Sequence, residues 1–186
     1  MSDLAPEVLA PLLRGRLGRP YRFVEECEST QRLLAADEAE GATVAADHQT
    51  QGRGRLGRTW LAPPGRALLF SVLLRPLPPL ARWPELSVVA GEAVAAALPV
   101  EASVSHPNDV LAGGRKLAGI LPEASDGRVV LGIGVNVNQT EEELPADATR
   151  PATSLRLETG REWERAPLLT AILSELERRY DAWQAG

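Results

Sequence analysis

The stretch QGRGRLGRTW, from Gln51 to Trp60, decides between the folds that this sequence could adopt. It contains the spacing G-x-G-x-x-G, which in dinucleotide-binding folds joins a strand to a helix whose N-terminus holds a pyrophosphate. The residues that follow include Pro63, Pro64 and Gly65, so no helix is expected to begin there. The Gly-Lys-Ser/Thr ending of a P-loop is also missing. The stretch therefore predicts an anion-binding loop of a different kind.

Three arginines, Arg53, Arg55 and Arg58, supply the positive charge of this loop. Guanidinium groups bind anions as bidentate donors, and the glycines between them let the backbone approach a ligand closely. We expect the loop to be mobile when empty, because its charges repel, and to become ordered over its ligand. Two alternatives stay open, a solvated basic surface loop and a nonspecific RNA-binding patch, although a net charge of -5 disfavours RNA.

Length and composition restrict the class of protein. With 186 residues, we expect one domain spanning 1–186. The single cysteine, Cys27, excludes an internal disulfide, and with only two histidines we predict no metal site built by the protein itself. The N-terminus lacks the pattern of a signal peptide, and no apolar run reaches membrane-spanning length. We therefore expect a cytoplasmic protein that binds neither DNA nor a membrane.

Hydrophobic periodicity and turn residues predict helices interspersed among short strands. The strands are expected at 21–25, 43–46, 67–74, 100–104, 116–124 and 128–137. The helices are expected at 6–17, 31–37, 83–98 and 166–183, with Ser29 or Thr30 as the N-cap of the second. Ser125-Asp126-Gly127 is a strong hairpin signal, so a purely parallel sheet is disfavoured. We predict an α+β fold in which a mixed β-sheet is flanked by helices.

One lysine stands among 20 basic residues, and it lies in the segment GRKLAGILPE, 114–123. Arginine fills every other Lys/Arg position. Lys116 therefore either has a role that requires its compact ammonium, or is the single lysine by chance. Gly119, Gly132 and Gly134 fall within predicted strands, where glycine marks either a ligand that approaches the backbone or a β-bulge. Pro107-Asn108-Asp109, shortly before, is typical of a turn.

Together with Ser29-Thr30-Gln31 and Gly132-Ile133-Gly134-Val135-Asn136, these segments resemble the catalytic domain of biotin protein ligase, also called biotin–acetyl-CoA-carboxylase ligase. The resemblance runs from Phe23 to the last helix and implies a fold related to class II aminoacyl-tRNA synthetases. It implies that biotin and ATP, accompanied by Mg²⁺, give biotinyl-5′-AMP and pyrophosphate. The biotinyl group would then pass to a lysine of a biotin carboxyl carrier protein. The oligomeric state is left open, with a homodimer as the candidate.

The resemblance also implies roles for individual residues. Lys116, Arg55 and Arg53 are the expected catalytic residues, which bring positive charge to the biotin carboxylate and the α-phosphate. The expected biotin-binding residues are Ser29, Thr30, Gln31, Gln49, Arg53, Gly54, Arg55, Lys116, Gly119, Leu121 and Gly134. The expected nucleotide-binding residues are Arg55, Arg58, Trp60, Asn108, Asp109, Lys116 and Asn136. Helix capping stays open as the role of Ser29 and Thr30, and turn formation as that of Asn108 and Asp109.

The sequence departs from the family pattern in three places. Ser105-His106 stands where the family usually has Lys-Trp before Pro-Asn-Asp, which removes a cation near the nucleotide. The residues before Phe23 are too few for an N-terminal DNA-binding domain, so we expect none. The chain also stops after the last predicted helix, so we expect the C-terminal SH3-like domain of many relatives to be absent.

Two other functions stay open at this point. The first is a lipoate ligase or octanoyl transferase of the same fold, which also uses one active-site lysine. The second is a binding module for biotin or a nucleotide with little catalysis, which the Ser105-His106 replacement and the short C-terminus would suit.

Overall fold

The computed structural model describes residues 2–145 and 150–186. Within these residues the strands form one seven-stranded sheet in the order β1-β2-β3-β7-β6-β5-β4. The strands are β1 (Tyr21–Cys27), β2 (Thr43–Gln49), β3 (Ala67–Leu74), β4 (Ala102–Ser105), β5 (Asp109–Ala112), β6 (Arg115–Ser125) and β7 (Arg128–Asn136). The pair β1–β2 is parallel and the other neighbouring pairs are antiparallel, so the predicted mixed sheet is confirmed.

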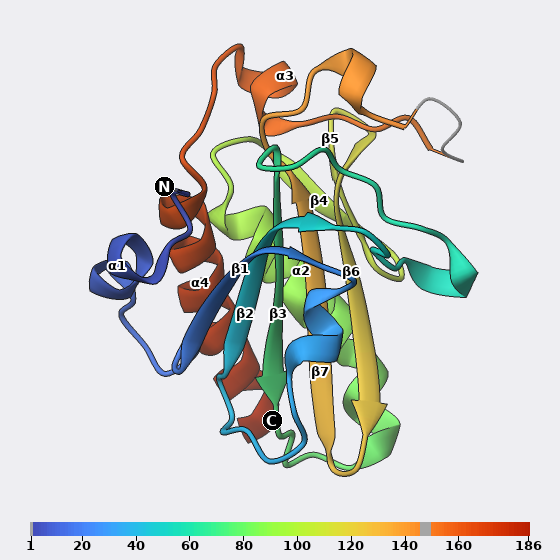
Figure 1. Cartoon of the computed structure of the whole chain (residues 1–186). Helices are drawn as coiled ribbons and strands as arrows, with labels where there is room; N and C mark the ends of the chain where they lie inside the picture. Colours follow the sequence, from blue (N-terminus) through green and yellow to red (C-terminus); the bar gives the residue numbers. More distant parts are fainter. Residues whose placement is uncertain (1, 146–149) are drawn as a thin grey trace.

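Two long helices cover one face of this sheet. The α-helices are α1 (Pro6–Leu9), α2 (Leu86–Ala97), α3 (Leu155–Thr159) and α4 (Arg165–Ala185). The 3-10 helices are η1 (Ala10–Leu12), η2 (Thr30–Leu33), η3 (Arg55–Gly57), η4 (Leu80–Glu85) and η5 (Glu141–Glu143). Helices α2 and α4 pack on each other behind the sheet, whereas η2 lies on its other face (Figure 1). None of the described helices is long and apolar enough to cross a membrane.

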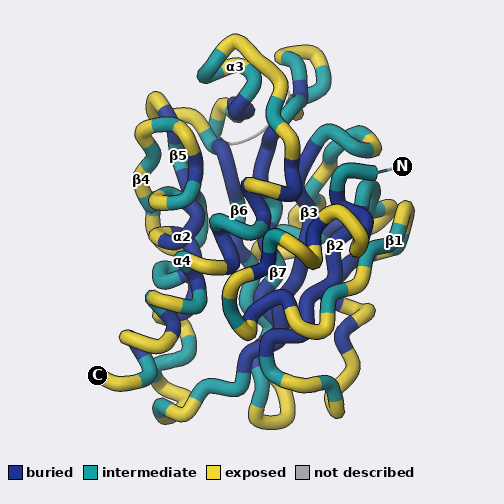
Figure 2. The backbone as a smooth tube through the Cα atoms, turned by 90° about the vertical axis from the view of Figure 1, so that its left-hand side faces the viewer, coloured by how far each residue is buried: buried dark blue, intermediate teal, exposed yellow. Residues whose placement is uncertain are grey.

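Strand β3 lies between β2 and β7 in the sheet and is buried along its whole length (Figure 2). Alternate side chains of β3 point to opposite faces of the sheet. Phe70 packs in the main hydrophobic core with residues of α4 such as Leu169, whereas Leu73 belongs to a smaller cluster that contains Leu34. Both faces of β3 are therefore covered, which explains why the run ALLFSVLL is apolar at almost every position.

The hairpin predicted at Ser125-Asp126-Gly127 is confirmed and joins β6 to β7. Asp126 and Gly127 adopt φ angles of 48° and 74°. Two consecutive residues with positive φ are the signature of the type I′ turn, whose twist matches that of the flanking strands. The turn fixes the register in which Gly119 of β6 faces Gly134 of β7.

Strand β6 contains a β-bulge near Gly119, one of the glycines for which the sequence left a β-bulge open, but its position at Leu117 was not predicted. Val110 of β5 pairs with Ala118, but the next residue, Leu111, pairs with Lys116, so Leu117 is an extra residue on β6. In a regular strand, residues 116 and 119 would point to opposite faces. The bulge turns both toward the same face, and a Cβ added to Gly119 would lie 3.5 Å from the Nζ of Lys116.

Several predicted boundaries were wrong. The first helix, expected at 6–17, ends at Leu12. The helix expected at 31–37 is only the 3-10 helix η2, and neither Ser29 nor Thr30 caps it with a side chain. Pro84 divides the helix expected at 83–98 into η4 and α2. The strand expected at 100–104 is shifted to β4, and Asp109, expected in a turn, begins the unpredicted strand β5.

Candidate active site

A cavity of about 780 Å³ opens on the face of the sheet opposite α2 and α4. Its walls come from η2, β2, the loop around Gln51–Trp60, and strands β3, β6 and β7. Ligand pockets for small molecules typically measure roughly 300–1,000 Å³. Every residue that the sequence assigned to biotin or nucleotide binding lines this cavity, including segments that are far apart in the chain. The fold therefore brings the whole predicted set together.

One end of the cavity carries a chain of neutral hydrogen-bonding groups. The Oε1 atom of Gln49 accepts a hydrogen bond from the Thr30 backbone N–H at 2.8 Å and one from the Thr30 hydroxyl at 3.1 Å. The Thr30 hydroxyl lies 2.7 Å from the Oγ of Ser71, which is fully buried. Because the Thr30 proton goes to Gln49, the Ser71 hydroxyl donates to Thr30. This arrangement fixes the orientation of the Gln49 amide toward the cavity.

Gln31 spans the floor at the same end. Its Nε2 donates to the carbonyl oxygens of Leu121 at 3.0 Å and Val130 at 3.3 Å, and so joins β6 to β7. A Cβ atom on Gly132 would lie 2.7 Å from the Gln31 Cδ. A side chain at position 132 would therefore collide with the packed Gln31 side chain. This close contact explains why the strand has a glycine at this position.

Trp60 covers the two other glycines of the floor. A Cβ on Gly134 would lie 2.6 Å from the indole Cε2, and one on Gly119 would lie 2.9 Å from Cζ3. The Trp60 backbone N–H donates to Gly52 at 2.9 Å, which anchors the ring where the loop returns to the domain. Only glycine leaves room for an indole flat on these two strands, so Trp60 and the floor form one packed unit.

Lys116 lies beside this unit. Its Nζ is 2.9 Å from the Oδ1 of Asp109 and 5.5 Å from the centre of the Trp60 ring. The Lys116 side chain is 28% exposed, so its charge borders both the cavity and the solvent. The backbone carbonyl of Lys116 accepts hydrogen bonds from Thr153 N–H at 2.9 Å and from Asn136 Nδ2 at 3.4 Å. These contacts hold the lysine from both sides.

The arginine-glycine loop forms the rim of the cavity. The Arg53 Nη2 pairs with the Oε2 of Glu123 at 2.7 Å, and the Arg55 Nη1 lies 3.5 Å from the Oδ1 of Asn108. Asn108 in turn donates to the carbonyl of Ile120 at 3.0 Å. Residues 61–66, all of them described, contain no helix, as predicted. The loop therefore presents side-chain charge, rather than a helix N-terminus, to the cavity.

Two buried polar atoms at the rim lack a partner among the residues that the structure describes. They are the indole Nε1 of Trp60 and the Nε of Arg53. A buried N–H without an acceptor costs about 1–3 kcal/mol. Both groups are donors and both belong to cavity-lining residues, so an acceptor on a ligand is the group that would satisfy them.

Sequence reasoning missed three residues of this region. Ser71 is a single hydroxyl in an apolar strand, and this polarity was the signal that could have revealed it. Glu123 was quoted within its segment but given no role, although it pairs with Arg53. Arg150 lines the cavity beside Lys116 without belonging to any recognised motif. The capping role of Thr30 is wrong, because its hydroxyl bonds to Gln49 and Ser71 instead.

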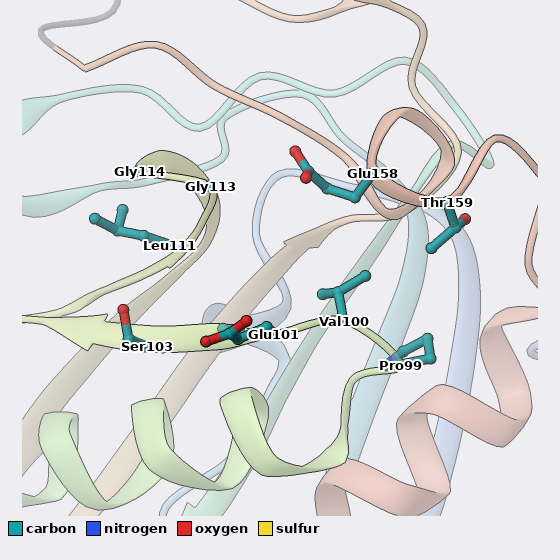
Figure 3. Close-up of a pocket in the computed structure, with 10 residues that line it drawn as sticks. Pro99, Val100, Glu101, Ser103, Leu111, Gly113, Gly114, Glu158 and Thr159 are labelled. Atoms are coloured by element: carbon teal, nitrogen blue, oxygen red, sulfur yellow. The ribbon is translucent and has the colours of Figure 1, made fainter.

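A second cavity, of about 540 Å³, lies beside the Gly113-Gly114 turn (Figure 3). Its polar side chains include Glu101 and Glu158. Glu158 already accepts from Arg115 Nη2 at 2.7 Å and from Thr153 Oγ1 at 2.5 Å. None of the predicted site residues lines this cavity, so the first cavity remains the candidate active site.

The fold and the first cavity together define an α+β domain with a cavity of small-molecule size, bordered by neutral groups at one end and cationic groups at the other. Comparison with known families agrees with this class: residues 24–139 match the model of the biotin/lipoate A/B protein ligase family. This chain belongs to that family.

Three relatives show how far the similarity extends. A biotin–[acetyl-CoA-carboxylase] ligase of Mycobacterium tuberculosis is 40% identical over 179 residues, which cover 89% of this chain and 66% of that protein. The bifunctional ligase/repressor BirA of Bacillus spizizenii is 38% identical, over 88% of this chain and 54% of that protein. A solved structure of biotin protein ligase from Aquifex aeolicus, in complex with biotin and ATP, superposes with a TM-score of 0.80 at 35% identity. That match covers 89% of this chain and 72% of that one. This chain thus spans about half to two thirds of the length of the curated relatives.

Proposed function

We propose that this protein is a biotin protein ligase, which activates biotin with ATP and transfers it to a lysine of a biotin carboxyl carrier protein. The observation that carries the proposal is one cavity with neutral hydrogen-bonding groups around Thr30 and Gln49 and cationic groups around Lys116 and Arg53. Biotin has a matching polarity, because its ureido ring is neutral and its other end is a carboxylate. The names of the similar ligases support the same substrate.

The neutral end suits the ureido ring of biotin. A ureido group offers N–H donors and a carbonyl acceptor, which the oriented Gln49 amide and the Ser71–Thr30 hydroxyl chain complement. A site built to hydrogen-bond a polar group of its substrate discriminates against an analogue that lacks this group. Lipoate, whose dithiolane ring has no N–H or carbonyl group, would form no hydrogen bond with these groups. This contrast favours biotin over lipoate in the same family.

The cationic end suits the joining of a carboxylate to a phosphate. A biotin carboxylate oxygen attacks the α-phosphorus of ATP, the bond to the pyrophosphate breaks, and pyrophosphate leaves. Because two anions must meet, the protein acts mainly by positioning them and neutralising charge. Lys116 supplies the ammonium for both groups, and Asp109 pairs with this ammonium. Arg53 and Arg55 add charge from the rim.

The second step requires that the adenylate is shielded from water until the carrier lysine reaches it. The amine of the carrier lysine attacks the biotinyl carbonyl, and AMP leaves. A mixed anhydride hydrolyses if water reaches it, so a cover over the site is part of its chemistry. Trp60, packed on Gly119 and Gly134, and the rim loop provide such a cover. The unpartnered Trp60 Nε1 and Arg53 Nε are donors that this adenylate would satisfy.

We infer that Mg²⁺ enters with the nucleotide. No group of three His, Cys, Asp or Glu side chains that could hold a metal ion occurs in the part of the chain that the structure describes. Mg²⁺ is commonly held by one or two carboxylates together with substrate phosphates. Asp109, the carboxylate that lines the cavity, is the protein group suited to complete such a site. The ion would neutralise phosphate charge.

Calorimetric titration with biotin and with lipoate tests the substrate. We expect biotin to bind with at least a hundred-fold higher affinity than lipoate, because only biotin can form hydrogen bonds with the neutral groups around Thr30 and Gln49. Adding MgATP to the biotin complex should then release pyrophosphate. Tight biotin binding without pyrophosphate release would mean that the protein is a biotin-binding module and not a ligase. Equal affinity for the two acids would overturn the assignment of biotin.

A further inference from the structure

Arg150 lies in the same cavity as the catalytic lysine, although it comes from a segment far along the chain. Its Nη1 donates to the Oγ of Ser105, the last residue of β4, at 2.8 Å. We propose that Arg150 binds the phosphate chain of the nucleotide. It would supply a positive charge that the neutral side chain of Ser105 lacks. The identification of the phosphate as part of ATP rests on the proposed function, whereas the anion site itself rests on geometry alone.

The backbone places Arg150 next to Lys116. Immediately after Arg150, the carbonyl of Pro151 accepts a hydrogen bond from Lys116 N–H at 2.8 Å. Ala152 forms a parallel bridge with Lys116, and Thr153 N–H donates to the Lys116 carbonyl at 2.9 Å. Residues 151–153 therefore run alongside the lysine, joined to it by an isolated parallel bridge. Arg150 directly precedes this paired segment, so its backbone is held close to Lys116.

Ser105 aims the guanidinium from the opposite side. In the register of β4 and β5, Ser105 pairs with Asp109, whose carboxylate contacts the Nζ of Lys116. The Ser105 hydroxyl therefore holds Arg150 beside the same pair of charges that Lys116 and Asp109 form. A guanidinium has five N–H donors, so one bond to a hydroxyl leaves donors for a phosphate.

The charge balance of the cavity favours Arg150 as a phosphate ligand. Asp109 offsets Lys116, and Glu123 offsets Arg53. Among the described residues, no carboxylate forms an ion pair with Arg150, whose partner is the neutral Ser105 hydroxyl. A triphosphate brings several negative charges and needs cations that the protein has not already neutralised. Arg150 is half-buried, where such a charge is screened less than on the surface.

Binding of inorganic tripolyphosphate, adenosine and biotin to three variants tests the inference. Arg150→Gln removes the charge, Arg150→Lys keeps it, and Arg156→Gln removes a matched arginine that pairs with Glu162 outside the cavity. By calorimetry we expect Arg150→Gln to weaken tripolyphosphate and MgATP about ten-fold or more, because a hydrogen bond to a charged group is lost. Arg150→Lys should restore part of this loss. Adenosine and biotin affinity should stay unchanged, as should every affinity of Arg156→Gln.

Other results would overturn the inference. If Arg150 only tethers its segment to β4, then Arg150→Gln will weaken biotin and adenosine as much as tripolyphosphate. Unchanged tripolyphosphate affinity in Arg150→Gln would likewise exclude a phosphate contact. Failure of the proposed function gives a different result: tripolyphosphate and MgATP still bind and depend on Arg150, but biotin with MgATP releases no pyrophosphate.

Discussion

Lys116 is the residue on which the proposed chemistry depends most. The sequence marked it because arginine fills every other basic position, and the structure sets its ammonium 2.9 Å from Asp109 and beside the Trp60 ring. A lysine ammonium is a compact charge with three rotatable donors, whereas a guanidinium is a wide planar fork. The site between Asp109 and Trp60 is built for the smaller group.

Replacing Lys116 by arginine should therefore block adenylate formation. We predict that Lys116→Arg folds normally but releases pyrophosphate at least a hundred-fold more slowly, which corresponds to the loss of about 3 kcal/mol of transition-state stabilisation. Pyrophosphate release at saturating biotin and MgATP measures the rate. The control is Arg115→Lys, the neighbouring exposed residue that pairs with Glu158. A Lys116→Arg rate close to that of the control would show that another residue carries the chemistry.

Gly134 tests whether the packed floor is needed for binding. A methyl group there would lie 2.6 Å from the Trp60 ring, so Gly134→Ala must displace the indole. We predict at least a ten-fold loss of biotin affinity, measured by calorimetry. Biotin binding at the affinity of the unaltered protein would mean that Trp60 does not have to lie on the glycines.

At the level of elements, the β6–β7 hairpin and the bulge at Leu117 shape the site. The turn was predictable because Asp126-Gly127 is a local signal that acts whatever surrounds it. The position of the bulge was not predictable, because it depends on how β5 pairs with β6 across the sheet. It is nevertheless the bulge that turns Lys116 and Gly119 to the same face. Local motifs therefore predicted the strands but not the direction of the Lys116 side chain.

The hairpin turn should matter for stability and not for binding. Gly127 has a φ of 74°, which costs an L-residue roughly 1 kcal/mol or more. We predict that Gly127→Ala lowers the free energy of unfolding by about 1 kcal/mol, measured by urea denaturation, and leaves biotin affinity unchanged. A large loss of biotin affinity would mean that the far end of the hairpin controls the cavity.

Across the whole molecule, ion pairs of the buried Arg165 with two partly exposed carboxylates join the N-terminal segment to α4 and the sheet. The Arg165 side chain is only 6% exposed and contacts the Oδ1 of Asp47 at 2.7 Å, the Oδ1 of Asp3 and the carbonyl of Ala67. Tyr21 adds a hydrogen bond from its hydroxyl to the Leu4 carbonyl at 2.8 Å. The segment before β1 is thus part of the packed domain, although its helix is shorter than the one that periodicity predicted at 6–17.

Removing Arg165 should destabilise the domain without touching the site. We predict that Arg165→Ala lowers the free energy of unfolding by about 3 kcal/mol, because Asp3 and Asp47 lose their buried partner. Thermal or urea denaturation measures this loss, with Arg14→Ala, at an exposed position, as the control. A change as small as that of the control would mean that the N-terminal segment contributes little to stability.

Turn residues and hydrophobic alternation predicted the hairpin and the mixed sheet, because both are local signals. The family resemblance, rather than any local pattern, supplied the set of residues that the fold gathers in one cavity. Ser71 and Arg150 were missed because their positions depend on long-range contacts, with Thr30 and with Ser105. Such contacts form only in the folded chain, and the one local sign of them was the single hydroxyl of Ser71 in an otherwise apolar strand.

Pyrophosphate release from MgATP, measured with and without biotin, tests most directly the proposal that this cavity joins a carboxylate to a nucleotide. We predict rapid release that requires biotin, is not supported by lipoate, and is lost in Lys116→Arg. Release that is independent of biotin, or no release from a protein saturated with both substrates, would contradict it.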